Sequence, residues 1–274
     1  MIPGYNTNGL AHHSPMDGLR LLADTGYKSV AITVDHGWFT STRQTADIKR
    51  FLTEQGMSSV IETGARFILD PRQKHSPTLL DPDPAAANQR IEFLKRCIDL
   101  AVELGSNCVS LWSGRKDPRQ SPQDAMGRLK DNLSVVLSHA ESVGVDIGFE
   151  PEPGMLVDTT SSFGQLLEQV SSPRLKMTMD IGHLHCLGEI PIADYIRRWS
   201  GMIVNIHLED MVRGKHEHLM FGEGEIDFAP VIQSLREIGY KQGIHVELSR
   251  HSHNAAEIVR QAFGFLQALL EAKD

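Results

Sequence analysis

The chain has few cysteines, no long apolar run and no excess of basic residues. Its three cysteines, Cys97, Cys108 and Cys186, include no CxxC pair, so the sequence predicts reduced thiols rather than disulfides. No apolar stretch reaches the roughly 18 to 20 residues that a membrane-spanning helix needs. The first residues also lack the basic and apolar regions of a signal peptide. We therefore expect a cytoplasmic protein with no membrane partner.

Acidic residues outnumber basic ones, 35 to 27, which gives a formal net charge of −8. Because phosphate backbones attract basic faces, this balance argues against a nucleic-acid partner. The length of 274 residues and the hydrophobic fraction of 41% allow a large buried core. A chain of this size fits one α/β barrel, for which roughly 250 residues is typical.

Strand-like and helix-like patterns alternate along the chain. Eight such units of about 34 residues predict a single (β/α)8 TIM barrel domain over residues 1–274, because parallel strands require crossover helices. A doubly wound sheet of eight strands is the alternative. The proline-rich segment 70–84 interrupts the rhythm and is predicted to be a long loop. The predicted strands span residues 2–6, 29–35, 58–62, 107–112, 146–149, 175–179, 203–206 and 244–246, and the predicted helices span 16–24, 42–55, 85–104, 122–143, 161–170, 192–199, 228–238 and 254–272.

The last four predicted strands each run into a residue that can bind a hard divalent metal. These residues are Glu150, Asp180, His207 and Glu247. In a closed barrel the carboxyl ends of the strands meet at one face, where such barrels place their active sites. Three carboxylates and one imidazole suit Mn²⁺ or Mg²⁺, and less ideally Co²⁺ or Zn²⁺. The sequence therefore predicts one shared metal site, with Mn²⁺ as the first expectation.

Three of these four residues also have a simpler interpretation when each is considered alone. Glu150 precedes a proline-rich turn and could be a solvent-facing loop acid. Asp180 could cap the next helix, and His207 could be a core histidine with its hydrogen bonds satisfied. The convergence of all four on strand ends favours the metal site over four independent explanations.

Further candidates for substrate contact lie at or after the predicted strand ends. Gly182 permits a tight turn that can direct Asp180 and His183 into one cavity. Arg213 could donate hydrogen bonds to a substrate oxygen or carboxylate. Glu62 could contact the substrate, and Trp112 could form an apolar wall of the cavity or pack in the core.

The pair His216-x-His218 follows the seventh predicted strand. Two histidines separated by one residue could bind a second metal, contact polar substrate atoms or face solvent, and the sequence leaves these alternatives open. We include His218 among the candidate substrate contacts.

These residues resemble those of the xylose-isomerase-like barrel proteins of the sugar phosphate isomerase/epimerase superfamily, and the resemblance covers nearly the whole chain. In ketose 3-epimerases of that superfamily, a Glu, an Asp, a His and a Glu at the ends of strands five to eight bind one divalent metal. They match Glu150, Asp180, His207 and Glu247. The resemblance also implies that the two glutamates form the proton-transferring pair.

The same resemblance matches His183 and Arg213 to substrate-binding residues of the epimerases. A further substrate-binding glutamate, six residues after the first metal glutamate, has no match, because Leu156 stands there. This departure weakens the specific assignment as a ketose 3-epimerase.

The resemblance implies a divalent-metal-dependent isomerase or epimerase that removes a proton next to a carbonyl of a small carbohydrate-like substrate. Alternatives are a dehydratase of a cyclic keto-polyol, of the inosose or dehydroshikimate type, and a phosphodiester hydrolase related to a DNA-repair endonuclease. That endonuclease also uses histidines after strands three and four, where Thr63 and Ser113 stand here. A binding barrel without turnover is a further alternative. Many relatives self-associate, but no surface stripe in the sequence establishes an oligomer.

Overall fold

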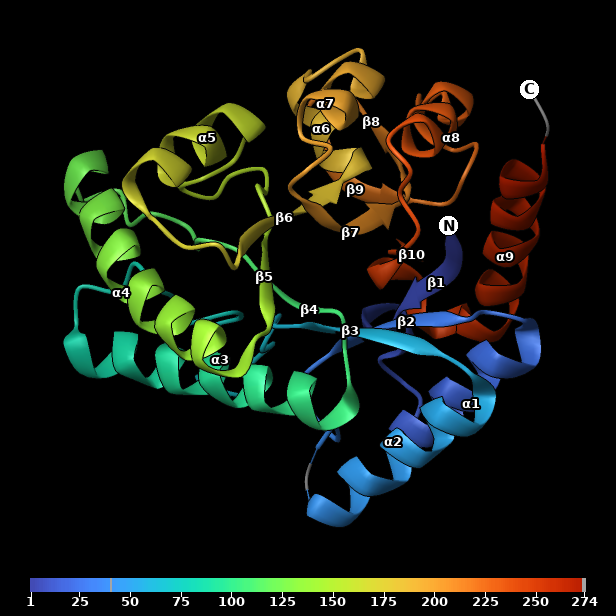
Figure 1. The fold of residues 1–274 in the computed structure, drawn as a ribbon, viewed down its shortest axis with the longest axis horizontal. Helices are drawn as coiled ribbons and strands as arrows, with labels where there is room; N and C mark the ends of the chain where they lie inside the picture. The colour runs from blue at the N-terminus through green and yellow to red at the C-terminus, as the bar shows by residue number, and fades with distance from the viewer. Residues whose placement is uncertain (40, 273–274) are drawn as a thin grey trace.

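Eight parallel strands close into a barrel in the computed structural model, which describes residues 1–39 and 41–272. The strand order around the barrel is β1-β10-β7-β6-β5-β4-β3-β2, and the helices lie outside the strands (Figure 1). This closure confirms the TIM barrel and excludes the doubly wound sheet; the last two residues of the predicted 1–274 domain lie outside the described residues. The barrel strands are β1 Ile2–Asn6, β2 Ser29–Thr33, β3 Ser58–Glu62, β4 Cys108–Leu111, β5 Asp146–Phe149, β6 Leu175–Asp180, β7 Ile203–Leu208 and β10 Gly243–Val246.

Most of the long helices begin directly after a side chain that caps their free backbone N–H groups. The Ser41 hydroxyl accepts from the Gln44 N–H at the start of α2, for example, and the Ser121 hydroxyl accepts from the Asp124 N–H at the start of α4. Among the described residues, no helix has the length and apolar character needed to cross a membrane. The helices are α1 Pro15–Thr25, α2 Thr42–Gln55, α3 Pro84–Leu104, α4 Pro122–Val143, α5 Thr160–Gln169, α6 Ile181–Leu187, α7 Ile192–Arg198, α8 Phe228–Glu237 and α9 Ala255–Glu271, with 3-10 turns at Thr7–Leu10 and Ser249–Asn254.

The structure adds two elements that the sequence does not predict. One is the short helix α6, which begins immediately after β6. The other is an antiparallel hairpin of β8 Asp210–Val212 and β9 Lys215–Leu219, which turns at Gly214 and pairs only with itself. Both elements are short, so neither shows a clear apolar period. The three cysteines are free and buried, as predicted.

Polar side chains fill part of the barrel interior below the carboxyl ends of the strands. The buried His245 ring lies between the Ser29 hydroxyl, 2.8 Å from Nε2, and the Asn205 Oδ1, 2.8 Å from Nδ1. Its ring has room because glycine stands both in its own strand, at Gly243, and in the adjacent strand β1, at Gly4. A Cβ on Gly4 would lie 2.5 Å from an atom of the ring, and a Cβ on Gly243 would lie 2.6 Å from one. The interior is therefore shaped around a fixed imidazole.

We expect Gly4→Ala to destabilise the protein by about 1–3 kcal/mol, because the added methyl group forces His245 from its two hydrogen bonds. Urea unfolding of the purified variant measures this free energy. Gly127→Ala is the control: Gly127 lies within α4 with nothing within 4 Å of an added Cβ. That change should raise stability by roughly 0.5–1 kcal/mol. Equal effects of the two substitutions would contradict the proposed crowding at His245.

Candidate active site

The four predicted metal ligands meet at the carboxyl end of the barrel. Glu150 follows β5, Asp180 ends β6, His207 lies in β7, and Glu247 follows β10. Each offers one ligand atom, and these atoms all lie within 4.8 Å of one another. The four side chains are between 0% and 14% exposed. Residues from strands separated by up to about a hundred positions therefore form one cluster, as the barrel predicts.

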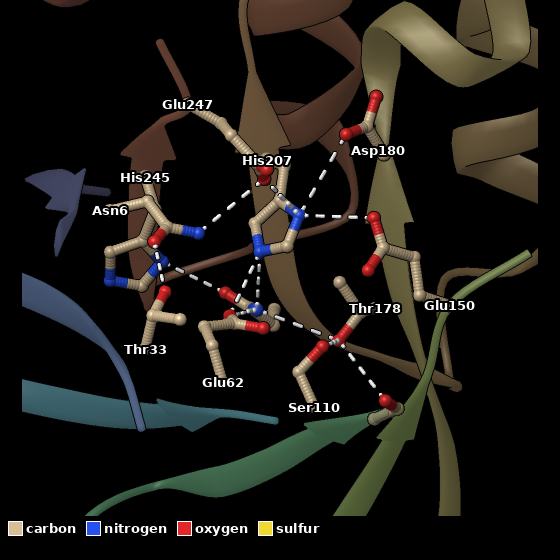
Figure 2. A network of polar contacts seen from close by, with 12 residues as sticks. Asn6, Thr33, Glu62, Ser110, Glu150, Thr178, Asp180, His207, His245 and Glu247 are labelled. Atoms are coloured by element: carbon tan, nitrogen blue, oxygen red, sulfur yellow. Dashed lines mark hydrogen bonds and ion pairs between the residues drawn. The ribbon is translucent and has the colours of Figure 1, made fainter. Parts of the chain in front are cut away.

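His207 is the centre of this cluster, and Figure 2 shows carboxylates on both sides of its ring. Its Nδ1 lies 3.2 Å from Glu150 Oε1, 3.0 Å from Glu247 Oε2 and 3.7 Å from Asp180 Oδ2. Its Nε2 lies 2.9 Å from Glu62 Oε1 and can donate a hydrogen bond to it. When the ring is neutral and Nε2 carries its proton, Nδ1 is directed unprotonated at three carboxylates, the arrangement of a metal-binding histidine oriented by an outer carboxylate. The residues present thus fit a divalent cation.

Asp180 combines the two roles that the sequence left as alternatives. Its Oδ1 accepts a hydrogen bond of 2.8 Å from the backbone N–H of His183, which caps the start of α6. Its Oδ2 is buried without a hydrogen-bond partner among the described residues. One oxygen therefore holds the helix, and the other remains available as a ligand.

Burial and mutual charge separate the pKa values of the two predicted proton-transferring glutamates. Burial raises the pKa of Glu150 well above its usual range, although His207 partly opposes this shift. Burial also disfavours ionisation of Glu247, but the charge and hydrogen bond of His207 outweigh it and lower the pKa of Glu247 to about 2. The pKa of His207 is itself raised well above its usual value: burial lowers it, and the negative charges of Glu62, Glu150 and Glu247 outweigh that effect. Glu150 therefore holds a proton more readily than Glu247.

A cavity of about 300 Å³ opens above this cluster, and Glu150, His207 and Glu247 line it. Trp112 forms part of its wall, with the Arg90 guanidinium carbon 4.9 Å from the centre of its ring. The cavity wall is thus largely polar with one aromatic face, which suits a small hydroxylated molecule.

The predicted substrate-contact residues have different positions in the structure. His183 and His218 line the cavity, as does Trp112. Glu62 also lines it, but its Oε1 is occupied by His207 and by the Asn205 amide, 2.9 Å away, so its contacts are those of a residue that orients His207.

Arg213 is not brought to the cavity. It is exposed, at the turn of the β8–β9 hairpin. Its guanidinium lies against Gly188 at the end of α6, where an added Cβ would be 2.5 Å from Nη2. The sequence could not indicate this direction, because the hairpin that carries Arg213 was not predicted.

Several residues of the site were missed by the sequence reasoning. Asn8 donates a hydrogen bond of 2.7 Å to Glu247 Oε1, and Asn6 donates one of 3.4 Å to Oε2. Glu152 lines the cavity, and burial with the charges of Glu247 and Asp180 raises its pKa to about 8. Asn6 ends β1 much as the four candidate ligands lie at the ends of their strands, so its position alone could have indicated it.

A model of the family described as xylose isomerase-like TIM barrel matches residues 19–269. The chain belongs to this family. It is 31% identical over 188 residues to the uncharacterized protein MJ1311 of Methanocaldococcus jannaschii, a match that covers 63% of this chain and 62% of that protein. It is 25% identical over 256 residues to the L-ribulose-5-phosphate 3-epimerase UlaE of Salmonella paratyphi A, covering 92% of this chain and 89% of the relative.

The fold is also similar to a crystal structure of the IOLI protein with a binding zinc atom. The two share a TM-score of 0.79 at 18% identity, and the match covers 98% of each chain. At this identity the comparison supports the fold alone.

We expect Glu62→Gln to weaken binding of Mn²⁺ about 10-fold or more, because the neutral amide makes the His207 ring a poorer ligand. Calorimetric titration of the metal-free protein with Mn²⁺ measures the affinity. Glu189→Gln is the matched control, since Glu189 is also buried but bonds to Thr160. An affinity in Glu62→Gln equal to that of the unaltered protein would contradict the orienting role of Glu62.

Proposed function

We propose that the protein is a divalent-metal-dependent isomerase or epimerase of a ketose-type sugar, which moves a proton at the carbon next to a carbonyl. The observation that carries the proposal is the pair Glu150 and Glu247. Both line the cavity, and both contact the Nδ1 side of His207, yet their pKa values are displaced in opposite directions. Such a pair supplies one base and one acid at the same substrate.

The cavity supports this chemistry with residues of defined roles. Glu247 is ionised, so it is the group that removes the proton next to the carbonyl. Glu150, whose pKa burial raises, is the group that returns a proton to the carbon from its own side of the cavity. A divalent cation bound by the four-residue cluster, with Mn²⁺ as the first candidate, would polarise the carbonyl oxygen. The UlaE relative, a 3-epimerase by name, supports the choice of reaction.

Other residues position the substrate and the base. Asn8 holds Glu247 Oε1 in a fixed direction through its hydrogen bond of 2.7 Å. His183 and His218 line the cavity, where an imidazole can donate to a substrate oxygen as negative charge develops. For His183 this requires release of its contact with His216 Nε2, 3.0 Å away. Glu152, whose raised pKa keeps it protonated at neutral pH, can donate to a substrate hydroxyl. These contacts favour a substrate with several hydroxyl groups.

The proposal is tested by incubating the Mn²⁺-loaded protein in D₂O with a panel of ketoses and their phosphate esters. Nuclear magnetic resonance then follows deuterium incorporation next to the carbonyl and the appearance of the epimer or isomer. Loss of water, detected as an unsaturated or deoxygenated product, would assign the dehydratase alternative instead. Absence of exchange with every ketose would overturn the proposal.

We expect Glu247→Gln to reduce solvent exchange at the substrate carbon by at least about 100-fold, because the amide cannot accept the proton. The same deuterium assay measures this loss, and circular dichroism checks that the variant is folded. Glu189→Gln, in which a buried glutamate away from the cavity loses its charge, should retain the original exchange rate. Full exchange in Glu247→Gln would rule out its role as the base.

A further inference from the structure

A second group of potential ligands lies beside the four-residue cluster. Asp180, Glu209 and His218 each offer one ligand atom within 4.8 Å of the others. Glu209 lies between β7 and β8, and His218 lies in β9 of the hairpin. The barrel and the hairpin therefore supply this group jointly, and Asp180 belongs to both groups.

Four polar atoms of this second group have no hydrogen-bond partner among the described residues. Both carboxylate oxygens of Glu209 are buried and unpartnered, as are Asp180 Oδ2 and His218 Nδ1. The Glu209 side chain is 0% exposed, and His218 is the only basic group of the described residues within 4 Å of it. A buried carboxylate without hydrogen bonds is costly, so such a group indicates that something else satisfies it.

The backbone makes room for Glu209 at this position. A Cβ on Gly182, in α6, would overlap Glu209 Oε1 and would lie 2.8 Å from the Met211 side chain. The absence of a side chain at residue 182 is therefore what allows the Glu209 carboxylate to lie beside Asp180. The close approach of Glu209 to α6 therefore depends on glycine at position 182.

The separations also fit a metal ion. His218 Nδ1 lies 3.9 Å from Glu209 Oε2 and 3.9 Å from Glu247 Oε1. Two atoms that bind one small divalent cation at about 2.1 Å each can be up to about 4.2 Å apart. Two carboxylates and one imidazole are ligands that Mn²⁺, Zn²⁺ or Co²⁺ accept.

We propose that Asp180, Glu209 and His218 bind a second divalent cation next to the first, with Asp180 shared between the two ions. The inference rests on the proposed four-residue metal site but not on the proposed reaction. Two ions that share a carboxylate lie about 3.5–4 Å apart in proteins. The second ion would neutralise Glu209 and bring the hairpin into the metal centre.

Two other states compete with this assignment. In one, Glu209 is protonated and donates to Asp180, because burial and the charge of Asp180 raise the pKa of Glu209 well above its usual range. In the other, a second ion binds His183, His216 and His218, whose ring nitrogens also lie within 4.8 Å of one another. There, however, His183 Nε2 and His216 Nε2 already form a hydrogen bond of 3.0 Å. The carboxylate site thus has more unsatisfied atoms than the three-histidine site.

The experiment is titration of the metal-free full chain with Mn²⁺, followed by calorimetry and by electron paramagnetic resonance. We expect two Mn²⁺ per chain in the unaltered protein, with a spin-coupled signal at two equivalents. Glu209→Gln should bind one Mn²⁺ with an uncoupled signal, because the amide is a poor ligand. His216→Gln, which disrupts only the three-histidine group, should still bind two. Thermal melting confirms that each variant is folded.

The remaining outcomes separate this inference from the proposed function. One Mn²⁺ per chain in both the unaltered protein and Glu209→Gln would overturn the second site and assign a proton to Glu209. Two ions that persist in Glu209→Gln but fall to one in His216→Gln would overturn it in favour of the three histidines. Two coupled ions in a protein that exchanges no ketose proton would support the second site while overturning the proposed reaction.

Discussion

Buried negative charge at the carboxyl end of the barrel is the constraint on which the rest of the site depends. A carboxylate removed from water costs several kcal/mol unless opposite charge or hydrogen bonds compensate it. His207 supplies at most one positive charge. That charge is shared between carboxylates at its two ring nitrogens, with Glu62 at Nε2 and Glu150 and Glu247 at Nδ1. The side chains it must serve are Glu62, Glu150, Asp180 and Glu247, with Glu209 buried nearby.

Neutral hydrogen-bond donors compensate part of this buried negative charge. The Asn8 amide bonds to Glu247, the Asn205 amide bonds to Glu62, and the first turn of α6 donates a backbone N–H to Asp180. The two amides and the acids they contact come from different strands and loops, so these two contacts depend on closure of the barrel, whereas the α6 N–H lies only three residues from Asp180. The negative charge that these donors leave uncompensated fits the cation proposed for this site.

Much of this arrangement could be predicted from the sequence, because it depends on local patterns. The strand runs that end at Glu150, Asp180, His207 and Glu247 were recognised, and a parallel barrel brings such ends together whatever the details of its loops. The bounds of β3, β5, α2 and α4 also match the predicted ones. The two helices are bounded by a serine that caps the first turn and a glycine that ends the last one.

The contacts that the sequence did not indicate depend on register across the barrel or on the hairpin. Glu62 reaches His207 over a separation of 145 residues, and only the alignment of β3 opposite β7 determines that it orients the ring. Arg213 was expected at the substrate because it closely follows His207, but the hairpin turns it toward the end of α6. The sequence gives no signal for Glu209, because the position of its carboxylate depends on the absence of a side chain at Gly182.

Besides the Gly214 N–H, which donates to the Cys186 carbonyl of α6 over 2.9 Å, the β8–β9 hairpin is tied to the rest of the molecule at its base. There Asp210 accepts backbone hydrogen bonds from Met211, Gly222 and Ile226, at 2.9, 2.9 and 3.1 Å. The two strands beyond this anchor pair only with each other, yet they carry His216 and His218 to the mouth of the cavity. Insertions, deletions or exchanges within the hairpin can therefore alter the lining of the cavity mouth while the eight-stranded scaffold and its buried acids stay in place.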